Sequence, residues 1–247
     1  MPSTTTTMFE STGAKLTKCN LDAAEYEMIR NAIAEIEGKL EECPPIELFG
    51  KVARQQRHVG FFADPAVTHG YFYSRSVAKS IPPGESIRAL LGFVNKEFES
   101  GFNGVLVNYY PDGDHYISDH SDSEAGLDPS GGVVIASAGA TRTMHFKRTK
   151  SPPIGTANFK YGAYKIPLTD GSLIAMRGTD FQKAYTHGIP KEAKASGPRW
   201  SFTFRHHTGE NEAPMIAAAE KTLARIAEKM AAADAEEAPA AKRAKRE

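Results

Sequence analysis

The length, composition and charge of the chain exclude several classes of protein. It has 247 residues, 40% hydrophobic and 24% charged, which suits one or two domains with a hydrophobic core. The 30 basic and 30 acidic residues balance, so any surface for nucleic acid has to be a local patch. The two cysteines, Cys19 and Cys43, exclude a disulfide framework and a cysteine-rich zinc module.

The sequence contains no signal for a membrane or for secretion. No apolar run is long enough to span a bilayer, and the N-terminal residues lack the apolar core of a signal peptide. We therefore expect an intracellular protein of the nucleus or cytoplasm. No feature of the sequence identifies an obligate protein partner.

The N-terminal part of the chain predicts two helices with short strands between them. Residues 1–15 are rich in Ser, Thr and Gly and predict a disordered lead-in. One helix is expected over 22–40, capped by Asp22 and stopped by the two prolines that follow Cys43, and a second begins after Gly84. The apolar residues at helical spacing are Ile29, Ile33, Ile36 and Leu40 in the first helix, and Ile87, Leu91, Val94 and Phe98 in the second. Short strands are expected at 46–50 and 70–75.

The region 104–205 reads as short strands separated by turns, with no helices between them. The expected strands are residues 104–110, 132–139, 141–148, 161–168, 171–178 and 199–205. This pattern is typical of an antiparallel sandwich, so we predict a mainly β, α+β fold, a double-stranded β-helix or jelly roll flanked by the N-terminal helices.

The C-terminal part of the chain completes the predicted domain organisation. An Ala-rich helix is expected over 214–233, followed by a disordered basic tail. The KRAKR sequence in that tail is either a nuclear-import or nucleic-acid tether or a solvated tail. The chain thus divides into a lead-in (1–15), one domain (16–210) and the helix with its tail (211–247). Within the domain, 16–103 holds the helices and a recognition segment, and 104–210 forms the jelly-roll core.

The densest polar run, residues 108–124, contains His120 and Asp122. Side chains at i and i+2 of a strand share a face, so this pair can converge on one metal ion. A His and an Asp bonded to the backbone of a turn would give the same pattern, so the pair alone leaves both interpretations open. His187 is the best candidate for a third ligand, and two His with one carboxylate leave open positions on Fe(II). The remaining histidines of this region are expected on the surface: His145, His206 and His207.

Basic side chains form three further groups. Arg199 and Arg205 share one face of a predicted strand, where they would bracket a short dicarboxylate or form internal ion pairs, one of them with Asp122. The two other groups either neutralise phosphates or are solvated surface charge. They consist of Lys51, Arg54 and Arg57, and of Arg142, Lys147, Arg148 and Lys150.

These motifs together resemble the AlkB family of Fe(II)/2-oxoglutarate dioxygenases. The similarity rests on N-x-Y at 108–110, H-x-D at 120–122, His187 and R-x5-R at 199–205, in this order and spacing. It extends from about Phe49 to Arg205. The sequences ELFGK, YFYSR and HSDSE resemble the eukaryotic homologues that repair alkylated DNA and RNA.

The resemblance implies which residues bind the cofactor and the cosubstrate. His120, Asp122 and His187 would bind Fe(II). Asn108 and Tyr110 would hydrogen-bond 2-oxoglutarate. Arg199 would hold its distal carboxylate, with Arg205 near the end that chelates the metal. The chain departs from the family at Ser201, where an asparagine is frequent, and a hydroxyl replaces only part of the hydrogen bonding of an amide.

The resemblance also implies a nucleic-acid substrate. Tyr73 would stack on a flipped base, with His120 on the other side of that base and Tyr71 alongside. Glu124 would face the exocyclic amine of the methylated base, and Arg54 belongs to the expected substrate site. A base inside a duplex has to be flipped out before such a site can act on it.

The expected function is oxidative demethylation of N-alkylated bases, of the 1-methyladenine and 3-methylcytosine type, in DNA or RNA. This DNA-repair reaction would couple the consumption of 2-oxoglutarate and O2 to hydroxylation of the methyl group and release of formaldehyde. Two alternatives stay open: an oxygenase acting on protein or a small molecule, and an inactive nucleic-acid binding module.

Overall fold

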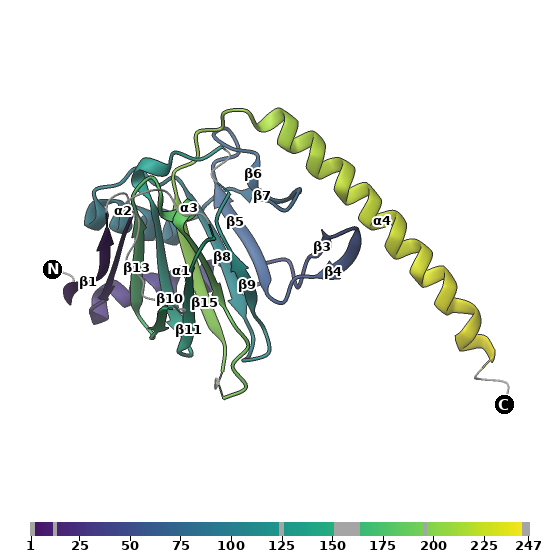
Figure 1. Cartoon of the computed structure of the whole chain (residues 1–247), viewed down its shortest axis with the longest axis horizontal. Coiled ribbons are helices and arrows are strands. Elements are labelled where there is room, and N and C mark those ends of the chain that lie inside the picture. The colour runs from purple at the N-terminus through teal and green to yellow at the C-terminus, as the bar shows by residue number, and fades with distance from the viewer. Residues whose placement is uncertain (1–2, 12–13, 124–125, 151–163, 195–196, 244–247) are drawn as a thin grey trace.

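The fold is a jelly roll built from two facing β-sheets. The computed structural model describes residues 3–11, 14–123, 126–150, 164–194 and 197–243 (Figure 1). The large sheet has nine strands in the order β1-β2-β13-β10-β15-β8-β5-β7-β6, and the small sheet has the order β12-β11-β14-β9. The large-sheet strands are β1 (Ser3–Ser11), β2 (Ala14–Asn20), β5 (His58–Ala63), β6 (Gly70–Tyr73), β7 (Ser76–Ile81), β8 (Gly104–Tyr110), β10 (Val133–Gly139), β13 (Ser172–Arg177) and β15 (Arg199–Arg205). The small-sheet strands are β9 (Ile117–His120), β11 (Arg142–Arg148), β12 (Tyr164–Leu168) and β14 (Tyr185–Ile189). The predicted fold class is thus confirmed.

The large sheet is covered on both faces, which explains its apolar strands. In β10, Val133 and Ile135 pack toward the small sheet together with Phe146, whereas Val134 and Ala136 pack toward the helices. Successive side chains of a strand point to opposite faces, so one apolar run supplies two separate cores.

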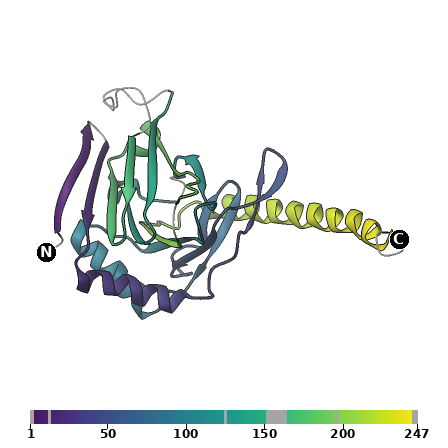
Figure 2. The ribbon, with the colours of Figure 1, turned by 90° about the horizontal axis from the view of Figure 1, so that it is seen from below.

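Two helices cover the outer face of the large sheet (Figure 2). They are α1 (Ala23–Ile36) and α2 (Glu85–Phe98). The predicted N-cap is confirmed, because the carboxylate of Asp22 accepts a hydrogen bond from Glu25 N while the Glu25 side chain accepts one from Asp22 N. The buried residues of the helices are Ile29, Ala32 and Ile36 in α1 and Ile87, Leu90 and Val94 in α2.

The N-terminal end of the chain differs from the prediction. Residues predicted to be a disordered lead-in form β1 and the start of β2, an antiparallel pair that extends the large sheet next to β13. The threonines suit a strand because their side chains are β-branched. Ala14 and Leu16 alternate into the core, and this burial fixes the register.

Residues 234–243 also differ from the prediction of a disordered tail, and residues 244–247 of that tail, with part of the KRAKR sequence, lie outside the described residues. Helix α4 (Glu212–Arg243) continues beyond the expected end at 233, since alanine has the highest helix propensity. It leaves the sandwich near β6 and β7 and passes a separate hairpin of β3 (Pro45–Leu48) and β4 (Lys51–Arg54) (Figure 1). None of the helices in the described residues combines the length and apolar content that a membrane span requires. A short helix, α3 (Phe181–Ala184), leads into β14, and a 3-10 turn at Pro129–Gly131 precedes β10.

Candidate active site

A cavity of about 350 Å³ opens between the two sheets and under the β3–β4 hairpin. Strands β8 and β15 of the large sheet form one wall, and β9 and β14 of the small sheet form the other. Residues of the hairpin and of β6 lie at its mouth. The predicted site residues that line it are Arg54, Tyr71, Tyr73, Asn108, Tyr110, His120, Asp122, His187, Arg199, Ser201 and Arg205.

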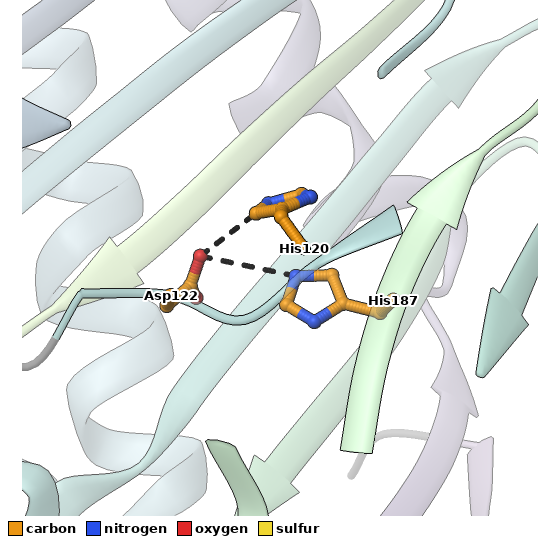
Figure 3. A group of neighbouring side chains, drawn as sticks. All are labelled: His120, Asp122 and His187. Atoms are coloured by element: carbon orange, nitrogen blue, oxygen red, sulfur yellow. Dashed lines mark ion pairs between the residues drawn. The ribbon is translucent and has the colours of Figure 1, made fainter. Parts of the chain in front are cut away.

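His120, Asp122 and His187 meet in this cavity (Figure 3). The Nε2 atoms of His120 and His187 lie 3.6 and 3.8 Å from Asp122 Oδ1. The antiparallel register of β9 and β14 pairs His120 directly with His187, which explains why two positions distant in sequence become neighbours. Asp122 lies beyond the end of β9, where its backbone N–H donates to Gln182 Oε1 from α3. The predicted pair therefore converges, although Asp122 is not itself a strand residue.

The protonation states of this group suit a divalent metal. Burial alone would raise the pKa of Asp122, but the guanidinium of Arg205 and the two imidazoles hold it well below its usual range. Burial, together with the neighbouring His120, lowers the pKa of His187 to about 3. A carboxylate and a neutral imidazole are the forms that bind metal.

The hydrogen bonds around this group also fit a cation. Asp122 Oδ1 is buried, and no described residue donates a hydrogen bond to it, although it faces both Nε2 atoms. A buried carboxylate oxygen without a donor is costly, and a cation between the three side chains would remove that cost. Among the described residues, these three form the only group of His, Cys, Asp or Glu side chains arranged to hold a metal ion.

Arg199 brings a buried charge into the same cavity. It is 1% exposed, its Nη2 donates to Ser137 Oγ at 2.8 Å, and its guanidinium lies 5.4 Å from the centre of the Tyr110 ring. Its Nε and Nη1 have no acceptor among the described residues. Burial lowers its pKa to about 10, so the side chain stays charged at neutral pH. A buried cation with free donors fits a carboxylate that enters from the cavity.

Arg205 has a different partner from Arg199. Its Nη2 donates to Asp122 Oδ2 at 2.6 Å, and its guanidinium lies 4.7 Å from the centre of the Tyr71 ring. Of the two interpretations of this arginine, the internal ion pair is confirmed. Its Nε and Nη1 also lack partners among the described residues, and the residue lines the cavity.

Asn108 and Ser201 face the cavity from neighbouring strands. They are directly paired in the β8–β15 ladder and are 7% and 5% exposed. Asn108 Oδ1 accepts a hydrogen bond from Arg57 Nε at 2.9 Å, which fixes the orientation of the amide. Arg57 thereby lines the cavity instead of joining a solvated basic cluster, a role that sequence reasoning missed.

Two stacked tyrosines of β6 lie at the mouth of the cavity. The rings of Tyr71 and Tyr73 have centroids 5.9 Å apart and an interplanar angle of 23°. Tyr71 is buried, and this burial raises the pKa of its phenol, whereas Tyr73 is half-buried and accepts a hydrogen bond from Gln55 Nε2. Arg54 lies at the rim, where it donates to the Cys43 carbonyl at 3.3 Å. Glu124 lies outside the described residues.

Two residues expected on the surface are buried. Arg142 is 1% exposed and donates to three backbone carbonyls, those of Asp112, His115 and Pro190, so it does not belong to a phosphate-binding cluster. His207 is 4% exposed and packs on Phe61, with ring centroids 4.8 Å apart. The prediction was wrong in both cases because a neighbouring layer covers these positions.

Comparison with known proteins places the chain among oxygenases. The family described as the 2OG-Fe(II) oxygenase superfamily matches residues 24–205. The chain is 33% identical over 137 residues to the mouse alpha-ketoglutarate-dependent dioxygenase alkB homolog 3, covering 55% of this chain and 47% of that protein. It is 31% identical over 165 residues to the human DNA oxidative demethylase ALKBH2, covering 65% and 60%, and 27% identical over 181 residues to the Arabidopsis thaliana ALKBH2, covering 66% and 56%. The chain thus spans roughly half the length of these relatives.

Proposed function

The chain belongs to the 2OG-Fe(II) oxygenase superfamily, and we propose that it is an AlkB-like demethylase of N-methylated bases in nucleic acid. The unpaired buried polar groups of the cavity carry the proposal. The buried Asp122 Oδ1 faces two imidazoles without a hydrogen-bond donor, and Arg199 presents unpaired donors to the same cavity. A metal ion and a dicarboxylate are the two ligands that would satisfy these groups.

In this proposal His120, Asp122 and His187 hold Fe(II), and Arg199 binds the distal carboxylate of 2-oxoglutarate. Bound Fe(II) and 2-oxoglutarate supply the oxidation of the methyl group with O2, after which the carbinolamine releases formaldehyde. Arg205 orients Asp122 through the ion pair between Nη2 and Oδ2, which leaves Oδ1 for the metal. Asn108, Tyr110 and Ser201 line the 2-oxoglutarate site. Their buried positions exclude water from it.

The mouth of the cavity supports a base as substrate. Tyr73 is half-buried and lies above the buried Tyr71, so its ring offers a flat face to an unstacked base. The alkB homologs are named as dioxygenases and oxidative demethylases, and the second of these names refers to DNA. A methyl group that blocks base pairing also lowers the cost of extruding the base.

The test uses the 247-residue chain with Fe(II), 2-oxoglutarate, O2 and DNA or RNA oligonucleotides carrying 1-methyladenine or 3-methylcytosine. Mass spectrometry should show loss of one CH2 unit per modified base, with stoichiometric succinate. Oligonucleotides of the same sequence without the methyl group are the control. Succinate that forms equally with both oligonucleotides, without demethylation, would refute the nucleic-acid substrate, and absence of both products would refute the enzyme activity.

A further inference from the structure

The β3–β4 hairpin at the mouth of the cavity has few attachments to the jelly roll. Its two strands form a separate two-stranded sheet, and neither strand continues the large sheet. Such an isolated hairpin is marginally stable in water. Nevertheless Ile46, Leu48 and Arg54 line the cavity, so the position of the hairpin sets the shape of the entrance.

The alternation of β3 directs one carboxylate away from the cavity. Ile46 and Leu48 share the face that lines the cavity, and Glu47 between them points to the opposite side. There Glu47 Oε2 accepts a hydrogen bond from Arg225 Nη2 at 2.6 Å, and Glu47 Oε1 accepts one from Lys229 Nζ at 2.6 Å. Lys229 Nζ also donates to the carbonyl of Gly50 at 2.7 Å, in the turn of the hairpin.

Helix α4 is itself anchored to the jelly roll at its start. Glu212 accepts hydrogen bonds from the Thr68 hydroxyl and from His69 N, next to β6. Ala219 and Ile226 are buried on one face of the helix, which contacts β7, β3 and β4. From Glu212 to Lys229 the helix spans about 26 Å at about 1.5 Å per residue. It therefore connects the segment next to β6, which carries the tyrosines, to the β3–β4 hairpin.

We propose that α4 is a brace that holds the β3–β4 hairpin over the cavity, and that Glu47, Arg225 and Lys229 are positioning residues for the substrate. The inference rests on the proposed function for the nature of that substrate. A hairpin that is already in place loses less conformational freedom when the substrate binds, so the brace increases affinity without touching the reacting atoms.

The decisive variant is Glu47→Gln, because simple electrostatics and the brace predict opposite changes in its affinity for the oligonucleotide. Removing a negative charge near a nucleic-acid site should tighten binding by simple electrostatics. If α4 is a brace, the same change frees the hairpin and weakens binding, by about twofold to fivefold for the loss of a largely surface ion-pair network. Glu42→Gln is the matched control, since Glu42 is exposed on the segment before the hairpin and carries the same charge.

Two measurements test the brace without relying on turnover. Hydrogen–deuterium exchange of residues 45–54 should increase in Glu47→Gln and in the double variant Arg225→Met/Lys229→Met, but not in Glu42→Gln. Fluorescence anisotropy with an oligonucleotide carrying 3-methylcytosine should show the weaker binding of Glu47→Gln. In turnover, KM for the oligonucleotide should rise, while kcat and KM for 2-oxoglutarate stay within about twofold.

The brace would be overturned if Glu47→Gln left hydrogen–deuterium exchange in the hairpin unchanged. It would also be overturned if the Glu47→Gln variant bound the oligonucleotide as tightly as the wild type and the Glu42→Gln variant do. Failure of the proposed function has a different signature. In that case the wild-type chain would not demethylate any oligonucleotide, whereas the comparison of exchange between Glu47→Gln and Glu42→Gln would still confirm or refute the brace.

Discussion

Replacing Arg199 by methionine should have opposite effects on the free chain and on the chain with 2-oxoglutarate. Arg199 is a fully buried cation with one side-chain acceptor, Ser137 Oγ, and two donors without partners among the described residues. Apolar replacement of poorly compensated buried charges is often stabilising, by about 1–4 kcal/mol. The free Arg199→Met variant should therefore melt at least about 2 °C above the wild type, since 1 kcal/mol shifts the Tm of a chain of this size by roughly 2–4 °C.

With 2-oxoglutarate bound, the wild type should gain more thermal stability than the Arg199→Met variant. At 2-oxoglutarate concentrations of about 100 times Kd, ligand binding stabilises a protein by about 2.7 kcal/mol, which corresponds to roughly 5–11 °C for the wild type. The variant loses two hydrogen bonds between charged groups, worth about 1.5–3 kcal/mol each, so its affinity should fall by at least about 100-fold. At the same concentration its Tm should then rise by about 2 °C or less.

The assay is thermal unfolding with Mn(II) in place of Fe(II) under anoxic conditions, so that no turnover occurs. Arg148→Met is the control, because Arg148 is an exposed arginine at the end of β11. A variant at position 199 that 2-oxoglutarate still stabilises by several degrees would refute the assignment of Arg199 to the distal carboxylate. A free variant less stable than the wild type would refute the view that its charge is uncompensated.

Three further predictions concern the metal group, a helix cap and the hairpin. Asp122→Ala should abolish metal binding in a titration. It should also lower the free energy of unfolding in urea by about 3–5 kcal/mol, because Arg205 is left buried without its partner. Adding Arg205→Met should restore stability but not metal binding. A loss below about 1 kcal/mol for Asp122→Ala would contradict the ion pair. Asp22→Ala removes the capping box of α1 and should lower the free energy of unfolding by about 1 kcal/mol without changing 2-oxoglutarate affinity; an unchanged free energy would argue against the cap. The hydrogen bonds from Arg225 and Lys229 lower the pKa of Glu47 from 4.5 to about 2. Protection of the hairpin from exchange, corrected for intrinsic rates, should therefore be constant above about pH 5 and disappear as the pH falls toward 2, and loss of protection near neutral pH would contradict this.

Much of the fold was predictable because its signals are local. Strands such as 104–110 and 199–205 are marked by apolar and β-branched residues between turns, and the capping box of α1 needs only Asp22 and Glu25. The three-residue group was predictable for a related reason, since few residue types bind Fe(II) and the H-x-D spacing is short. The meeting of His187 with that pair, however, depends on the register between β9 and β14.

The sequence could not predict which polar residues are buried, because their burial depends on another layer of the fold that covers them. Arg142 lies in an expected strand and His207 follows one, and polar residues of these types are mostly exposed to water. Their burial is possible because three backbone carbonyls from two separate segments, 112–115 and Pro190, surround the Arg142 guanidinium and because Phe61 packs on the His207 ring. These neighbours are distant in sequence.

The sequence alone therefore determined strands such as β8, β10, β11, β13 and β15 and the first two helices, because each follows from residues close together in sequence. It also determined which residue types carry the chemistry of the cavity. Tertiary structure decided the pairing of Arg205 with Asp122, the addition of β1 and β2 to the sheet, and the contact between α4 and the hairpin. Each of these brings together segments separated by many residues, and their proximity exists only once the two sheets and the helices have packed.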